Sequence, residues 1–202
     1  KSRLISIEDL KAGIFYAMKE NLMIQFVYPN FELPQEYKDV INTIDHSVIV
    51  SSLCEDSALK DNADVVVMYD WSAIEWMKFD TDISYVLRTT KSDLFDRYRF
   101  LMPVIGKVSR LNVIITDVEC FKDDDFEIYK NVLSSLSTEI EKLYVEGKST
   151  QLNLLTDRMM LDKMNNCNAG WENITLAPDG KFYVCPAFYH AQQADGSETS
   201  IS

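Results

Sequence analysis

The chain has 202 residues, of which 47% are apolar and 26% charged, and its formal net charge is −12. This composition is typical of a folded globular protein, and the length suits one domain or one domain with a small appendage. The negative charge repels phosphate backbones and anionic lipids, so it argues against nucleic-acid and membrane partners. The densest basic stretch, 88–99, mixes Arg and Lys with Asp93 and Asp96 and is interpreted as a solvated helix face.

No apolar run approaches the roughly 20 residues that a membrane span requires. The four cysteines are too few and too scattered for a small disulfide scaffold. The simplest expectation is therefore a cytoplasmic protein with reduced thiols.

The first half of the chain alternates helical and strand-like patterns. Ser6 followed by Asp9 is typical of a helix N-cap, and the apolar stripe that follows runs to Asn21. Short apolar runs predict strands, and the run 65–68 is of the kind found in parallel sheets covered on both faces. The sequence predicts strands at 22–28, 46–51, 63–69 and 83–87 and a second short helix at 36–44.

The second half continues this alternation. Asp123, Asp124 and Asp125 open the clearest helix, where three carboxylates favour the positive end of the helix dipole, and Gly147 closes it. The other predicted elements are a helix at 94–108 that is kinked at Pro103, a strand at 111–116 and a strand at 151–155.

Strands that alternate with helices predict an α/β fold over residues 1–163. We expect a partial (β/α) barrel or an open, mainly parallel sheet with flanking helices. An eight-stranded barrel takes about 250 residues, so this chain has too few units for one.

The tail predicts a small β-hairpin. Apolar residues alternate on both sides of a Pro-Asp-Gly turn at 178–180, and Cys167 and Cys185 lie towards its outer ends. Folding the hairpin brings two thiols together, as a soft-metal site requires. Buried free thiols, a disulfide or a zinc-binding module of unrelated function are the alternatives.

These residues also match a known pattern. Cys167, twelve residues, Gly180, four residues and Cys185 resemble the opening of a SPASM domain, and so do the flanking words Cys-Asn-Ala-Gly and Cys-Pro-Ala-Phe. Residues 164–202 would then be the N-terminal part of a SPASM-like domain. Residues 107–161 resemble the end of the catalytic barrel in radical-SAM peptide maturases. The stretch from Leu152 to Cys167 is most similar to the CXXX repeat peptide maturase family.

The resemblance implies a radical-SAM/SPASM-related maturation protein that acts on a ribosomally made cysteine-repeat peptide. It makes Cys167 and Cys185 part of an auxiliary 4Fe-4S iron–sulfur site, whose remaining cysteines would fall beyond Ser202. The catalytic spacing Cys-x3-Cys-x2-Cys is absent, so no catalytic residue is assigned, and S-adenosylmethionine is expected only if such cysteines lie outside this chain. A non-catalytic peptide-binding scaffold is the alternative.

The other reactive or aromatic residues have structural interpretations. We expect buried or half-buried thiols at Cys54 and Cys120, a solvated side chain at His190 and a turn residue at His46. The three tryptophans, Trp71, Trp76 and Trp171, are expected to be packing anchors.

Overall fold

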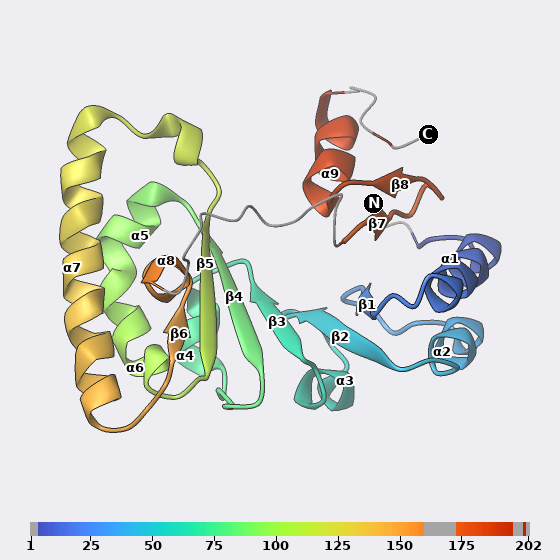
Figure 1. Cartoon of the computed structure of the whole chain (residues 1–202), viewed down its shortest axis with the longest axis horizontal. Helices are drawn as coiled ribbons and strands as arrows, with labels where there is room; N and C mark the ends of the chain where they lie inside the picture. Colours follow the sequence, from blue (N-terminus) through green and yellow to red (C-terminus); the bar gives the residue numbers. More distant parts are fainter. Residues whose placement is uncertain (1–3, 160–172, 196–199, 201–202) are drawn as a thin grey trace. The chain divides into compact units, whose positions relative to one another are not determined.

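The computed structural model describes residues 4–159, 173–195 and 200. It contains two compact units (Figure 1). The sheet unit comprises Gln25–Glu32 and Ser47–Asp162. The hairpin unit comprises Lys1–Ile24, Leu33–His46 and Lys163–Ser202.

The sheet has six strands whose spatial order follows their order in the chain. The pairings from β2 to β6 are all parallel. The strands are β1 (Ile24–Val27), β2 (His46–Ser51), β3 (Val65–Met68), β4 (Ser84–Thr89), β5 (Arg110–Ile115) and β6 (Gln151–Leu152). The predicted α/β class with a mainly parallel sheet is therefore confirmed.

Burial alternates along the strands, which corrects the expectation of a sheet covered on both faces. Val66 and Met68 in β3 are buried, whereas Val65 and Val67 between them are only half-buried. In β4 and β5 the same alternation continues, with an exposed Arg88 between two buried residues. A parallel sheet in sequential order places all its right-handed crossovers on one face, so only that face receives the helices.

The helices of the sheet unit supply the other half of the core. Buried residues of α5, α6 and α7 form one cluster with the buried face of the strands, and Figure 1 shows these three helices on the same side of the sheet. The elements are α3 (Ser57–Asp61), α4 (Ser72–Trp76), α5 (Lys91–Arg97), η1 (Tyr98–Leu101), α6 (Met102–Ile105), η2 (Val118–Cys120), α7 (Asp123–Val145) and α8 (Thr156–Met159).

The predicted helix at 94–108 is a run of three short elements. α5 gives way to a 3₁₀ turn, and α6 then begins with Pro103 in its first turn. Proline lacks an amide hydrogen and has a fixed φ, so it fits the start of a helix better than its interior. The prediction of one kinked helix is wrong because Pro103 opens a new helix instead.

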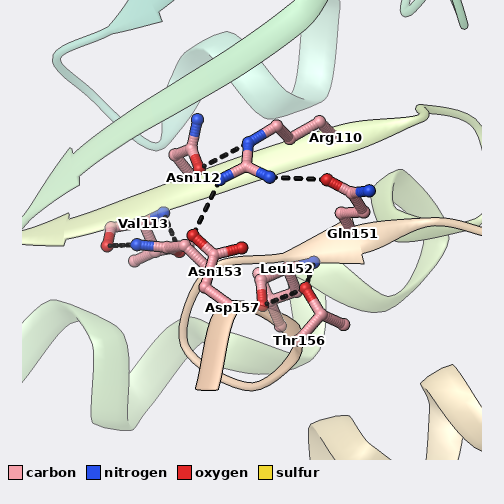
Figure 2. Close-up of polar contacts among 8 residues, drawn as sticks. All are labelled: Arg110, Asn112, Val113, Gln151, Leu152, Asn153, Thr156 and Asp157. Carbon is pink, nitrogen blue, oxygen red and sulfur yellow. Dashed lines mark hydrogen bonds and ion pairs between the residues drawn. The ribbon is translucent and has the colours of Figure 1, made fainter. Parts of the chain in front are cut away.

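The free edge of β6 is closed by side chains (Figure 2). The hydroxyl of Thr156 accepts a hydrogen bond from the Leu152 N–H and donates one to the Leu152 carbonyl, both at 2.9 Å. On the opposite side, the Asn153 amide accepts from the Val113 N–H at 2.7 Å and donates to its carbonyl at 3.0 Å. The predicted strand at 151–155 therefore stops after two residues, and no further strand can pair at Leu152.

A second set of contacts in Figure 2 joins β5 to the chain after β6. The Arg110 guanidinium donates to Asn112 at 3.1 Å, to Gln151, and to Asp157 at 2.7 Å. Register pairs Arg110 with Gln151 directly across the ladder. These partners hold the edge strand at its correct position.

Replacing Thr156 by Val should destabilise the sheet unit by about 1–3 kcal/mol. Thr156 is 5% exposed, and an isosteric methyl leaves the N–H and C=O of Leu152 without partners. Urea unfolding measures the loss. Thr138→Val is the matched control, because its hydroxyl donates only to the Ser134 carbonyl on an exposed face of α7. Equal stability of the two variants would contradict the role given to Thr156.

The hairpin unit packs a small antiparallel pair on its first helix. Its elements are α1 (Ile7–Lys19), α2 (Gln35–Ile41), β7 (Thr175–Leu176), β8 (Phe182–Tyr183) and α9 (Pro186–Asp195). The predicted cap is confirmed, because the Ser6 hydroxyl accepts from the Asp9 N–H at 3.0 Å. The rings of Tyr16 and Phe182 lie 5.5 Å apart.

Two glycines permit this packing. A Cβ on Gly13 would overlap the Leu176 side chain, so β7 lies against the backbone of α1. Gly180 has a φ of +77°, and its Cβ would lie 2.7 Å from an Asp9 carboxylate oxygen. A side chain at either position requires its neighbour to move.

Gly180→Ala should cost more stability than Gly147→Ala. Both glycines have positive φ, at +77° and +84°, so each substitution carries the left-handed penalty of about 1–2 kcal/mol. Gly147 has no atom within 4 Å of a built Cβ, whereas Gly180 meets Asp9. Hydrogen exchange at the Ala177 amide, which bonds to the Lys181 carbonyl across the turn, should quicken in Gly180→Ala alone. Equal protection in both variants would contradict the contact.

Candidate functional site

A hollow of about 360 Å³ lies at the carboxyl end of the central strands of the sheet unit. Ligand sites of βα proteins lie at this end, where the loops after several strands meet. Three segments line it: the residues after β3, the end of β4 with the start of α5, and the residue after β5. They are Tyr69, Asp70, Trp71, Arg88, Thr89, Thr90, Asp93, Arg97 and Thr116.

Hydrogen bonds fix the floor of the hollow. Trp71 is 7% exposed, and its indole N–H donates to the Thr89 hydroxyl at 2.9 Å. That hydroxyl donates to the Thr90 carbonyl at 3.1 Å. The Thr89 carbonyl accepts from the N–H of Thr116 at 2.8 Å and from its hydroxyl at 3.1 Å. Strands β4 and β5 are therefore held together at their ends, below the opening.

The rim carries charge and one aromatic face. The Arg88 guanidinium lies 5.8 Å from the centre of the Tyr69 ring, a cation–π contact. The Arg97 Nε lies 3.7 Å from an Asp93 carboxylate oxygen, with both side chains about half exposed. At that exposure the ion pair contributes little to stability, so it leaves both groups available to a ligand.

Asp70 adds a second carboxylate to the rim. Hydrogen bonds from the Ser72 N–H and hydroxyl hold the pKa of Asp70 below its usual value, and the charge of Arg97 acts in the same direction. Asp70 is therefore ionised at neutral pH. The hollow thus presents two guanidinium groups and two carboxylates.

The start of α5 is anchored from both sides. The Thr90 hydroxyl accepts from the Asp93 N–H at 3.2 Å and donates to the Asp93 carboxylate at 2.9 Å. The Lys91 N–H donates to Asp117 at 2.7 Å. The Lys91 ammonium donates to Asp125 and to the Cys120 carbonyl, both at 2.6 Å. These contacts fix the backbone that carries Asp93 and Arg97.

The first turn of α7 has the carboxylates that the sequence predicts, and Asp125 has further roles there. Its carboxylate accepts from the Lys122 N–H at 2.8 Å as well as from Lys91. The Lys91 hydrogen bond is the main cause that lowers the pKa of Asp125, and the Lys122 N–H contributes further.

The predicted metal ligands are placed only in part. Cys167 falls outside the described residues. Cys185 follows β8 and precedes α9, is half-buried, and its carbonyl accepts from the Phe188 N–H at 3.2 Å. Within the ranges that the structure describes, no three His, Cys, Asp or Glu side chains come together in a way that could hold a metal ion.

The remaining predictions for single residues have mixed outcomes. Cys54 is buried and His190 is exposed, as expected. Cys120 is exposed rather than half-buried, because it ends the 3₁₀ turn before α7. Trp71 is a packing anchor, but Trp76 is 56% exposed and lies 5.9 Å from the Lys60 ammonium. Trp171 lies outside the described part of the chain.

Sequence reasoning missed Arg88 and Arg97 as site residues. It assigned 88–99 to one solvated helix face, whereas Arg88 belongs to β4 and α5 begins only at Lys91. The available signal was position: Arg88 lies at the carboxyl end of a predicted strand, where side chains of neighbouring parallel strands converge.

Comparisons of the chain with protein-family models, with curated proteins and with solved structures find no match. Among the helices in the described ranges, none is both long and apolar enough to cross a membrane.

Lys91→Met should raise the pKa of Asp125 towards the ordinary value of about 3.9. When folding lowers the pKa of a carboxyl group, the ionised group stabilises the folded state at every pH above the pKa that it has in the unfolded chain. This stabilisation is lost as the pH falls through the lower pKa of the folded state. The variant should therefore be less stable than the original at neutral pH, and the difference should shrink below about pH 4.

Carbon-13 NMR titration of the Asp125 carboxyl and urea unfolding at several pH values measure both effects. Lys130→Met is the matched control, because Lys130 meets Glu127 only at 3.9 Å on the exposed surface of α7. An unchanged Asp125 titration in Lys91→Met would contradict the assignment.

Proposed function

We propose that this chain takes part in the maturation of a ribosomally made cysteine-repeat peptide, as a relative of the radical-SAM/SPASM maturases, and that its sheet unit binds the peptide. The observation that carries the proposal is the hollow at the carboxyl end of β3, β4 and β5. It combines a rigid floor, an aromatic face and four charged side chains. A peptide offers the groups that such a lining recognises, namely backbone amides and charged or polar side chains.

The topology supports the peptide-binding role. Six strands in sequential order, with helices packed on one face, have the connectivity of a partial (β/α) barrel, and a barrel-like curvature of the sheet belongs to this proposal. In such folds the loops at the carboxyl end carry the function and the opposite end carries stability. The outer edge of β6, closed by Thr156 at Leu152, is consistent with a sheet that ends at six strands.

The second part of the proposal concerns Cys167 and Cys185, which we assign to an auxiliary iron–sulfur site in a SPASM-like domain. The pairing of β7 with β8 supports it, because Cys185 lies two residues after the last paired residue, Tyr183. A 4Fe-4S cluster usually takes four thiolates, and Cys185 is the one cysteine of the hairpin unit that the structure describes. The described residues of this unit therefore supply one of the four thiolates that a cluster takes.

Binding is the role that we propose for these 202 residues, rather than cleavage of S-adenosylmethionine. Reductive cleavage needs an iron with an open coordination position, which three closely spaced thiolates normally leave. The cysteines of this chain are Cys54, Cys120, Cys167 and Cys185, and no two of them have the catalytic spacing. After iron–sulfur reconstitution and anaerobic incubation with S-adenosylmethionine and a strong reductant, we expect no 5′-deoxyadenosine above a protein-free control.

The peptide site is tested with a blocking substitution. Thr116 lines the hollow and is exposed, so Thr116→Trp should fill the opening. The probe is a reduced, end-capped synthetic peptide of Cys-Ser-Ala-Gln repeats with a fluorescent label. We expect it to bind the original chain and to lose most of its affinity for Thr116→Trp. Thr138→Trp, on the exposed side of α7, is the matched control and should bind normally. No binding by the original chain, or equal binding by Thr116→Trp, would refute the proposal.

The iron–sulfur assignment has its own test. Anaerobic reconstitution with iron and sulfide should load less iron on Cys167→Ala and on Cys185→Ala than on the original chain. Cys120→Ala is the matched control, because Cys120 is an exposed thiol of the sheet unit. Iron loading that none of these substitutions changes would refute the role of the pair.

A further inference from the structure

Arg88 has donors that the protein does not use. Its guanidinium lies 5.8 Å from the centre of the Tyr69 ring, and within the described ranges it has no hydrogen bond or ion pair. A contact with a ring face uses none of the N–H donors of a guanidinium. Asp70 and Asp93 line the same hollow, but neither forms an ion pair with Arg88 within the described ranges.

Arg97 is only loosely engaged. Its Nε is 3.7 Å from Asp93, which is longer than a hydrogen bond. The other Asp93 carboxylate oxygen already accepts from the Thr90 hydroxyl at 2.9 Å. Among the described residues Arg97 makes no other hydrogen bond or ion pair. Its terminal N–H groups are therefore available in the same hollow as those of Arg88.

We infer that Arg88 and Arg97 together bind a carboxylate in this hollow. The planar, five-donor guanidinium matches the two oxygens of a carboxylate, and two such groups line this one hollow. That the carboxylate is presented by a peptide, on an acidic side chain or at its C-terminus, rests on the proposed function. The carboxylate site itself rests only on the lining of the hollow.

The charges of the lining favour a monoanion over a dianion. Arg88 and Arg97 contribute +2, and Asp70 and Asp93 contribute −2, so the four groups that line the hollow sum to zero. A carboxylate adds one negative charge to this set, whereas a phosphate monoester adds nearly two. The second charge is repelled by both aspartates at short range. A carboxylate therefore fits the hollow better than a phosphate group does.

The first test uses a small probe and observes the arginines directly. The Nε–Hε NMR signals of the arginines are assigned with Arg88→Gln and Arg97→Gln, and the original chain is titrated at fixed ionic strength with N-acetylglutamate amide. We expect saturable shifts at Arg88 and Arg97, with none from N-acetylglutamine amide. The absence of shifts, equal shifts from the neutral probe, or shifts from inorganic phosphate at lower concentration would each overturn the inference.

The second test measures specificity with peptides. Peptides of Cys-Ser-Ala-Glu and Cys-Ser-Ala-Gln repeats differ only in the carboxylate, and the Glu peptide should bind about tenfold more tightly, as a charge-assisted hydrogen bond implies. Arg88→Gln and Arg97→Gln should each remove this preference. Arg99→Gln is the matched control, because it changes the net charge equally and Arg99 lies 5.6 Å from the Tyr98 ring, outside the hollow.

The outcomes separate the two proposals. Equal binding of both peptides to the original chain would overturn the carboxylate site and leave peptide binding intact. Binding of neither peptide, with the small probe still shifting both arginines, would refute the proposed function and support the carboxylate site. A preference for the Glu peptide that survives in both arginine variants would overturn the assignment of these two residues.

Discussion

The sheet unit depends on one constraint: its parallel strands follow one another in space in the same order as in the chain. Every crossover then steps in the same direction, and the right-handed rule places the connecting helices on one face. That face packs against the core residues of α5, α6 and α7 and is buried from solvent. The other face keeps half-buried valines and polar side chains such as Arg110 and Asn112. The one-sided cover follows from strand order, and not from any single residue.

This topology also leaves a free sheet edge, at which further strand pairing must be blocked. A parallel sheet wound in one direction has two free edges, and an unpaired edge strand is a template for further pairing. At β6 the side chains of Thr156 and Asn153 take the places of backbone groups. The Thr156 hydroxyl faces outward at Leu152, and the Asn153 amide faces inward to Val113. Two short polar side chains therefore end the ladder after two residues of β6 and leave no N–H or C=O of Leu152 to recruit another strand.

The sequence predicted the α/β class and α7 well because their signals are local. The apolar stripe of α7, its acidic first turn and Gly147 all lie within one continuous segment. Features that depend on neighbours distant in the chain were missed. The run 65–68 is apolar throughout, yet only its alternate residues are buried, since strand order decides which face is covered. Likewise, the end of β6 depends on the Thr156 hydroxyl, which forms hydrogen bonds with Leu152, four residues earlier in the chain.

The candidate site shows the same limit. Arg88, Arg97 and Tyr69 are spread over 29 positions of an acidic sequence, and no spacing rule links a strand end to a residue on the following helix. They meet because β3 and β4 are neighbours and because Thr89 ties β4 to Trp71 below and to Thr116 beside it. The pattern of Cys167 and Cys185 could be recognised because its residues lie within one short segment of the sequence. Its chemistry, however, depends on where the other metal ligands lie, and the motif alone does not give their positions.

The carboxylate site that we propose rests on backbone that is held in place beneath the rim. The Trp71 indole N–H donates to the buried Thr89 hydroxyl, and the backbone of α5 is held through Lys91 to Asp117 and Asp125. Preorganised donors bind with less loss of conformational freedom than mobile ones. Arg97 and Asp93 meet at 3.7 Å with both side chains about half exposed, so in the carboxylate site that we propose a ligand would replace a weak contact with a charge-assisted hydrogen bond.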